Sequence, residues 1–180
     1  MKKLLLGILL LCSVSAFAKE FTEVIEAPGK TADQLYSSAR EWFAETFKSA
    51  DDVLQMDDPV SGKLIGKGFD KVPIKAAGMI VEIKMQYTIK IFVKDGRFKY
   101  DIANIRVGEL ATSTLEEYEL ACSPEGAKKA LIDAGMKNPG KKIIEKTASN
   151  NKINYPKFEE AIKNIVADLK IAMKGAEDDW

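Results

Sequence analysis

The chain has 180 residues, of which 27 are Lys or Arg, 27 are Asp or Glu and none is His, so its formal net charge is zero. The absence of histidine excludes the Ser-His-Asp and Cys-His catalytic mechanisms and the usual histidine-rich zinc sites. Two cysteines, Cys12 and Cys122, are too few for a thiolate-rich metal centre. We therefore expect no cofactor and no metal site.

The N-terminus has the three parts of a secretory signal peptide. Lys2 and Lys3 precede an apolar run at 4–11, and Ala16-Phe17-Ala18 then forms an A-x-A cleavage site. The apolar run is shorter than the roughly 20 residues that span a bilayer. The sequence therefore predicts a signal peptide at 1–18 and an exported protein, either periplasmic or extracellular.

The remainder, 19–180, is expected to form one domain. Without Lys2 and Lys3 it keeps 25 of the 27 basic residues against 27 acids, a formal net charge of −2. That charge gives no electrostatic footprint for nucleic acid. Charges recur throughout this part, so we expect no transmembrane segment after cleavage, and its single cysteine, Cys122, predicts no internal disulfide. An uncleaved membrane anchor and a lipid anchor through Cys12 stay open as alternatives.

The domain is predicted to begin with a strand and an amphipathic helix. A short strand is expected at 21–26, and Thr31 with Gln34 forms a capping box that begins a helix over about 32–48. Apolar residues recur at helical spacing, which indicates one buried face. These residues are Leu35, Ala39, Trp42, Phe43 and Phe47.

Two short strands are predicted next. The first covers 53–56 and ends at Asp57-Asp58-Pro59, and the second covers 63–69. Gly66 and Gly68 interrupt the second strand, but they match neither G-x-G-x-x-G nor the Walker pattern. We therefore expect a bulge or a close backbone approach there, and no phosphate site.

The strongest pattern lies at 79–107. Apolar and polar residues alternate from Val81 to Lys94, which predicts a long strand with one buried face. Asp95-Gly96 is a two-residue hairpin turn, and it determines the pairing of the next strand. The expected pairs are Lys94 with Arg97, Val93 with Phe98, Ile91 with Tyr100, Lys90 with Asp101, and Ile89 with Ile102.

Residues 108–155 carry weaker signals and are expected to be a variable segment. Ser123-Pro124-Glu125 predicts the start of a short helix that stops at Gly135. A loop is indicated at Ser149-Asn150-Asn151. The final helix, with a clear apolar stripe, is predicted to begin at Pro156.

The expected order of elements is β-α-β-β-β-β-α. Two one-sided helices must bury their apolar stripes, and the long hairpin offers one apolar face. The sequence therefore predicts a two-layer α+β domain with both helices packed on one face of an antiparallel sheet. The other face of the sheet is expected to be polar and open to solvent.

Several segments resemble a known family when they are taken in order. They are the A-x-A leader, a T-x-x-Q-L-Y…W-F helix, a Gly-Lys-Leu-Ile-Gly-Lys-Gly strand, a Tyr-Thr-Ile-Lys-Ile-Phe-Val-Lys-Asp-Gly-Arg-Phe-Lys-Tyr hairpin and an Asp-Asp-Trp tail. Over 20–107 and 156–180 the chain resembles an exported bacterial family of domains of unknown function that is described as having a TBP-like fold. The resemblance implies the shape and no known activity, so it supplies no catalytic residues.

The polar face of the predicted hairpin is the candidate ligand site, because basic residues outnumber acids there. Such a surface favours an anionic ligand, such as a glycan acid or a lipid headgroup. The alternative is a solvated face whose lysines prevent aggregation between strands. The five basic residues are Lys84, Lys90, Lys94, Arg97 and Lys99, and the two acids are Glu82 and Asp101.

These observations predict a non-catalytic envelope protein that binds an unknown ligand or protein partner. The open sheet face and 108–155 are its candidate contact regions. The alternative is a carboxylate-dependent hydrolase that acts on envelope or extracellular glycans. A hydrolase of this kind needs two buried acids in one cleft, whereas the sequence patterns place acids at turns and on the solvated face.

Overall fold

The computed structural model describes residues 20–47, 53–76, 78–109 and 112–175. Within these ranges the strands form one antiparallel sheet in the order β1-β5-β4-β3-β2, and β6 pairs with β5. The predicted signal peptide, Cys12 and the Asp-Asp-Trp tail lie outside the described residues. In chain order the elements are β1 (Phe21–Glu26), α1 (Ala32–Phe47), β2 (Leu54–Asp58), β3 (Lys63–Ala76), β4 (Met79–Lys94), β5 (Arg97–Val107), β6 (Ser113–Thr114), α3 (Leu115–Leu120), α4 (Pro124–Asp133) and α5 (Lys141–Lys174).

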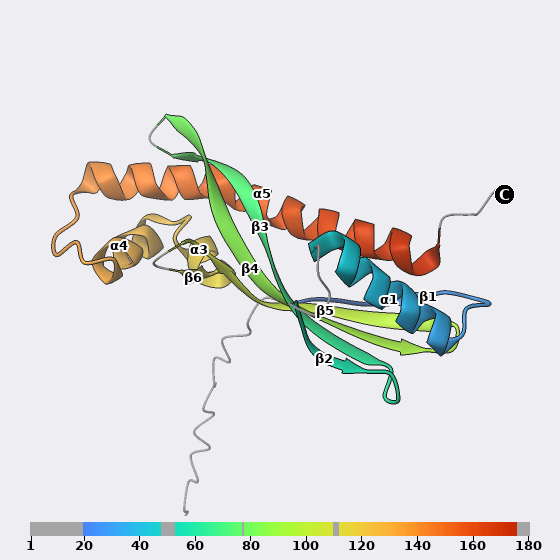
Figure 1. Cartoon of the computed structure of the whole chain (residues 1–180). Helices are drawn as coiled ribbons and strands as arrows, with labels where there is room; N and C mark the ends of the chain where they lie inside the picture. The colour runs from blue at the N-terminus through green and yellow to red at the C-terminus, as the bar shows by residue number, and fades with distance from the viewer. Residues whose placement is uncertain (1–19, 48–52, 77, 110–111, 176–180) are drawn as a thin grey trace, which may run out of the picture.

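Helices cover one face of this sheet, as the sequence predicts. Helix α5 runs along the length of the molecule, with α1 beside its C-terminal half and α4 beside its N-terminal half (Figure 1). The expected order contains only two helices, whereas the described residues also contain α3 and α4 between β5 and α5. Helix α3 begins at a capping box formed by Thr114 and Glu117, a signal that the sequence analysis did not use. No helix in the described ranges is long and apolar enough to cross a membrane.

Aromatic side chains of α1 fill the space above two strand glycines. The predicted capping box is present, since Thr31 Oγ1 accepts from the Gln34 N–H at 3.2 Å and Gln34 Oε1 accepts from the Thr31 N–H at 2.9 Å. A Cβ atom on Gly66 would lie 2.4 Å from the ring of Phe43, and one on Gly68 would lie 2.4 Å from the ring of Phe47. The two glycines therefore admit aromatic rings against β3, in place of the expected close approach of another backbone. The register irregularity that was the other expectation occurs opposite Gly66, in β2 between Leu54 and Met56.

The central hairpin has the predicted register at every pair from Lys94–Arg97 to Ile89–Ile102. Its turn also contacts the start of α1. The Ala32 N–H donates to Asp95 Oδ1 at 2.7 Å, and Gly96 has a φ of +72° that favours glycine. The hairpin therefore positions both the sheet and the first helix.

Two elements extend much further than the sequence predicts. Strand β3 continues beyond residue 69 to Ala76, because Pro73 directs its missing N–H away from β4 and removes no ladder hydrogen bond. Helix α5 begins at Lys141 and contains Pro156, so the predicted start at Pro156 and the predicted loop at 149–151 are wrong. Ala148 and Asn154 are buried, so packing favours the longer helix over local loop propensity.

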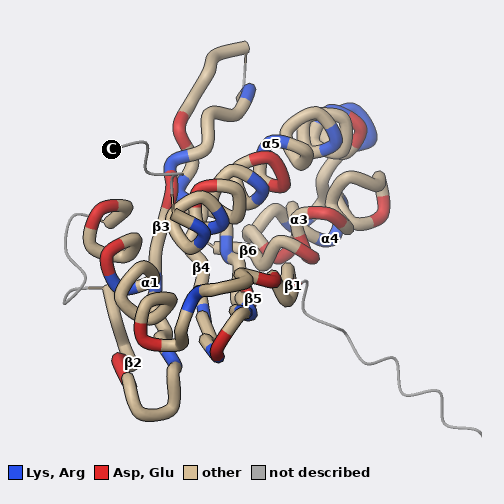
Figure 2. Tube along the Cα trace, turned by 90° about the vertical axis from the view of Figure 1, so that its right-hand side faces the viewer, with Lys and Arg blue, Asp and Glu red and all other residues tan. Residues whose placement is uncertain are grey.

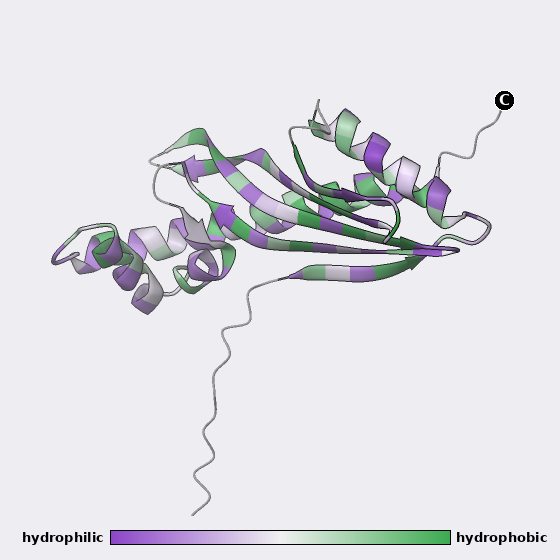
Figure 3. Ribbon diagram, turned by 60° about the horizontal axis from the view of Figure 1, so that its bottom comes forward, coloured by the Kyte–Doolittle hydropathy of each residue, from purple (hydrophilic) through white to green (hydrophobic). Residues whose placement is uncertain are grey.

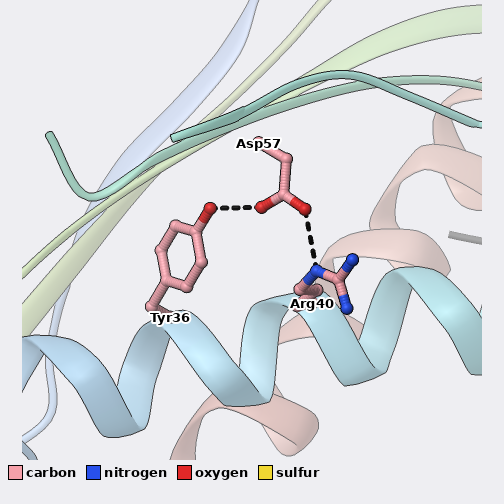
Figure 4. A network of polar contacts seen from close by, with 3 residues as sticks. All are labelled: Tyr36, Arg40 and Asp57. Carbon is pink, nitrogen blue, oxygen red and sulfur yellow. Dashed lines mark hydrogen bonds and ion pairs between the residues drawn. The ribbon is translucent and has the colours of Figure 1, made fainter. Parts of the chain in front are cut away.

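A polar network joins α1 to β2 at the edge of the sheet. Asp57 accepts hydrogen bonds from the Tyr36 hydroxyl and, at 2.7 Å, from Arg40 Nε (Figure 4). Both donors lower the pKa of the Asp57 carboxyl, with the larger effect from Tyr36. Burial and the neighbouring carboxylate together raise the pKa of Tyr36. Asp57 therefore contributes to the packing of α1. It also lies inside β2, which continues to Asp58, so the predicted end of this strand before Asp57 is wrong.

Candidate binding surface

The sheet face opposite the helices carries the predicted basic residues. Figure 3 shows this face with α5 behind the strands, and hydrophilic and hydrophobic residues alternate along β4 and β5. The pairings align its side chains in rows that cross all five long strands. One row is Val24, Lys99, Phe92, Lys63 and Asp58, and the next is Thr22, Asp101, Lys90, Ile65 and Met56.

Four of the five predicted site residues lie near the hairpin turn. Lys94 and Arg97 are paired at the turn itself, and Lys90 and Lys99 occupy adjacent rows. Lys84 has the same strand parity but lies six positions from Lys90, which is about 20 Å along a strand. The structure therefore brings together Lys90, Lys94, Arg97 and Lys99 and leaves Lys84 apart.

Phe92 is the centre of this group. Its ring centroid is 5.6 Å from Lys63 Nζ and 5.7 Å from Lys99 Nζ, so an ammonium group flanks the ring on each side. Phe92 is the apolar exception among the otherwise polar even-numbered positions from 82 to 94, and neither Phe92 nor Lys63 is among the five predicted site residues. We call Lys63, Lys90, Phe92 and Lys99 the Phe92 cluster.

A sequence signal for Lys63 did exist. Apart from the half-buried Ile65, the odd-numbered residues of β3 are polar or exposed from Lys63 to Lys75, while Leu64, Val72 and Ile74 are buried. Extending the period-2 analysis across the whole of β3 places Lys63 and Lys67 on the open face. Figure 2 shows the lysines and arginines of β3 and of the neighbouring strands in blue.

The positive charge of the cluster is only partly compensated. Asp101 Oδ1 lies 3.1 Å from Lys99 Nζ and also accepts from the Thr22 hydroxyl. Among the described residues, neither Lys90 nor Lys94 has an ion-pair partner. Lys84, apart from the cluster, lies 4.3 Å from the ring centroid of Phe69. The hairpin end of the open face therefore presents ammonium groups around one aromatic ring.

The helix side of the sheet contains a different feature, a cleft of about 580 Å³ between the end of α1, β3 and α5. Two of its carboxylates accept hydrogen bonds from aromatic donors: Trp42 Nε1 donates to Asp168 at 2.9 Å and Tyr87 Oη donates to Asp70 at 2.9 Å. Burial, with a smaller contribution from Asp70, raises the pKa of Tyr87. Asp70 is half-buried and Asp168 is exposed.

No group of three or more potential metal-ligating side chains occurs in the described part of the chain. Cys122 is half-buried, and burial raises the pKa of its thiol. A raised thiol pKa lowers the fraction of reactive thiolate at neutral pH. Cys122 is therefore better suited to packing than to nucleophilic chemistry.

Comparison with solved structures shows the fold. The chain is similar to a DUF4468 family protein from Bacteroides ovatus, with a TM-score of 0.63, 18% identity and coverage of 91% of this chain and 90% of that chain. It is also similar to a TBP-like protein from Parabacteroides distasonis, with a TM-score of 0.61, 12% identity and coverage of 88% and 94%. Comparison with curated proteins gives no match.

The family comparison concerns the sheet and its first helix. Residues 21–107, from the start of β1 to the end of β5, match the family described as a domain of unknown function (DUF4468) with TBP-like fold. The same segment holds the Phe92 cluster and the hairpin whose register the sequence predicts. The two similar structures extend the likeness in shape beyond it, since they cover about nine tenths of the chain. Residues 21–107 therefore carry the match to the DUF4468 family, and the chain has the TBP-like fold.

Proposed function

We propose that this domain is a non-catalytic binding module that takes up an anionic ligand on its open sheet face. The observation that carries the proposal is Phe92, whose ring lies between the ammonium groups of Lys63 and Lys99. Phe92 is half-buried on the open face, and both ammonium groups lie over its ring. An aromatic ring and flanking cations together suit a ligand with negative charges and a flat apolar surface.

Acidic glycans and anionic lipid headgroups share this chemistry. Both present negative groups at intervals, and both could meet Lys90 in the next row of the sheet as well as Lys63 and Lys99. The attraction is mainly long-range, because these lysines are solvated, so salt should weaken it strongly.

A hydrolase is the less favoured function. Catalysis by paired carboxylates requires an acid that is poised by its surroundings, usually through burial. Asp70 and Asp168 line one cleft, but Asp168 is exposed and each carboxylate accepts from an aromatic side chain that it helps to orient. These contacts support a structural role for both acids.

We also propose export of the protein, on the basis of the leader pattern at 1–18. Mass spectrometry of the protein recovered from outside the cytoplasm should give an N-terminus at Lys19. A lipid-modified Cys12 would instead place the binding face beside a membrane.

The binding proposal is tested by titrating polygalacturonate, and separately phosphatidylglycerol vesicles, into the protein. The two probes distinguish a glycan from a lipid as the source of the charge. Measurements at about 0.01 M and about 1 M salt compare Debye lengths of roughly 30 Å and 3 Å. Wild type should bind one probe at low salt and lose most of that affinity at high salt.

Two variants locate the site. Lys90→Ser with Lys99→Ser should weaken binding about threefold to tenfold, because the ligand loses two charge contacts with partly exposed lysines. The matched control is Lys142→Ser with Lys146→Ser, which removes two exposed lysines from α5 and should leave affinity unchanged apart from the small effect of net charge. Phe92→Leu tests the ring, since it keeps an apolar side chain. Equal affinities for wild type and the Lys90/Lys99 variant would remove the open face from consideration.

A further inference from the structure

One edge of strand β3 is only partly paired with a neighbouring strand. The Val93 N–H donates to the Gly62 carbonyl at 2.8 Å, and the β3–β4 register then directs the even-numbered residues of β3 toward β4. The odd-numbered residues direct their N–H and C=O groups to the opposite edge, where β2 lies. Pairing with β2 ends at Gly66, opposite Leu54. Strand β3 is therefore an edge strand from Lys67 to Ala76.

Helix α5 satisfies the far end of this edge. Asn154 is buried, and its side-chain amide accepts from the Lys75 N–H at 2.9 Å and donates to the Lys75 carbonyl at 2.9 Å. Lys157 Nζ donates to the Pro73 carbonyl at 2.9 Å, and Pro73 has no N–H. Two helix side chains thus pair with β3 in the way that a neighbouring strand would.

Phe69 and Lys71 are the next outward-facing residues. Within the described ranges, no group pairs with their outward-facing backbone N–H and C=O groups. The cleft lies beside this part of the strand, since Lys71, Val72 and Pro73 line it together with α5. Its volume of about 580 Å³ falls within the roughly 300–1,000 Å³ of ligand pockets. The structure thus combines an open strand edge with space beside it.

We propose that an extended, basic peptide segment of another protein pairs with β3 as an added strand beside Phe69 and Lys71. Main-chain hydrogen bonds to the open edge would supply the affinity, as in other cases of strand addition. Alternate side chains of an added strand point to the helix side, where the carboxylates of Asp70, Glu160 and Asp168 outnumber the ammonium groups of Lys71 and Lys157 in the lining of the cleft. The backbone edge makes the site, and these carboxylates give the preference for Lys or Arg. This site lies away from the Phe92 cluster and does not depend on the proposed function.

The probe is a labelled peptide, acetyl-Thr-Lys-Thr-Lys-Thr-amide, which presents threonines on one side of an extended strand and lysines on the other. Fluorescence anisotropy should show saturable binding to wild type, and NMR hydrogen exchange should show slower exchange at the Phe69 and Lys71 amides. A peptide with alternate amide nitrogens methylated should not bind, because it cannot complete the ladder. Absence of saturable binding up to about 1 mM peptide, or binding without protection of these two amides, would overturn the proposal.

A matched pair of variants isolates the backbone contribution. Lys71→Pro and Lys71→Thr remove the same charge, but only proline removes the outward N–H. The fold tolerates proline at this edge, as Pro73 shows at the position with the same orientation. Lys71→Pro should bind the peptide at least about tenfold more weakly than Lys71→Thr. Equal affinities of the two variants would contradict strand addition, and if Lys71→Pro does not fold, the amide protection in wild type decides. The Lys90→Ser/Lys99→Ser variant should bind the peptide as wild type does.

Discussion

The two faces of the sheet follow different physical rules. On the helix side, the rings of Phe43 and Phe47 rest against Gly66 and Gly68 so closely that a single added carbon would meet a ring at 2.4 Å. On the open side, Lys63, Phe92 and Lys99 lie in a row that none of the described helices covers. The covered face is constrained by shape, whereas the open face is constrained mainly by charge and strand parity.

This difference separates stability from binding. Close-packed interiors respond to a change of one methylene, whereas exposed side chains away from special features usually change stability by less than about 0.5 kcal/mol. Substitutions on the covered face should therefore change folding, and substitutions on the open face should change affinity alone. The following predictions test this separation, beginning with the largest expected effect.

Gly66→Ala should lower the free energy of unfolding by about 2–3 kcal/mol, the upper part of the range for overpacked cores. The new Cβ would displace the fully buried ring of Phe43. Denaturant unfolding measures the change, and Gly140→Ala is the control, because a Cβ at Gly140 meets no atom within 4 Å. The control should cost no more than about 1 kcal/mol, for a poorer helix N-cap. Similar costs for both variants would show that the glycine–aromatic contact is not restrictive.

Gly96→Val should lower the free energy of unfolding by about 1–2 kcal/mol through backbone strain. The residue has a φ of +72°, and a Cβ there meets no atom within 4 Å, so the conformation alone sets the cost. Gly96→Asn should be milder, because asparagine tolerates this region of φ. Thermal unfolding of both variants checks the order, and a valine variant as stable as wild type would contradict the hairpin turn.

Asp57→Asn should lower stability by about 0.5–1 kcal/mol near neutral pH, since Tyr36 and Arg40 lose an ionised acceptor that is itself part-exposed. The pKa of Asp57 is lowered in the folded state, so its contribution is present above the ordinary carboxyl pKa of about 3.9 and is lost as pH falls through the folded value. The difference between wild type and Asp57→Asn should therefore shrink below about pH 4. A difference that stays constant down to pH 2 would argue against the Tyr36–Asp57–Arg40 network.

Lys90→Ser with Lys99→Ser should change the free energy of unfolding by less than about 0.5 kcal/mol. Lys99 has one ion pair, with Asp101, and its own side chain is 45% exposed. The Thr22 hydroxyl still donates to Asp101 when Lys99 is replaced, so the carboxylate keeps a partner. Denaturant unfolding under the conditions of the binding experiment provides the check. A clear loss of stability would mean that the open face contributes to folding and that the two faces are not independent.

The sequence predicts best where one signal dominates. The hairpin register follows from a two-residue turn and strict alternation, and every predicted pair from Lys94–Arg97 to Ile89–Ile102 is present. The two largest errors of extent both involve proline. Pro73 lies at an edge position that needs no ladder hydrogen bond, and Pro156 lies inside a helix that buries Ala148 and Asn154 upstream of it. The arrangement of the whole fold decided both cases. The presence of a proline does not by itself reveal whether that arrangement tolerates it.

The candidate site could be predicted only in part, because some of its residues come together through pairing between distant strands. Strand alternation places Lys90, Lys94, Arg97 and Lys99 together, because all four belong to one hairpin. Lys63 joins them from β3, and its position beside Phe92 depends on a pairing between strands that no local turn determines. The open edge at Phe69 and Lys71 depends on where β2 ends, which is also a property of the whole sheet.

The central claim is that the open face, and not the cleft, receives the anionic ligand. NMR chemical-shift mapping with polygalacturonate at low salt tests it most directly. We predict shifts at the amides of Lys63, Lys90, Phe92 and Lys99 that disappear at high salt, with no change at Asp70 or Asp168. Shifts gathered around Asp70 and Asp168, or no shifts on the open face at low salt, would contradict the account.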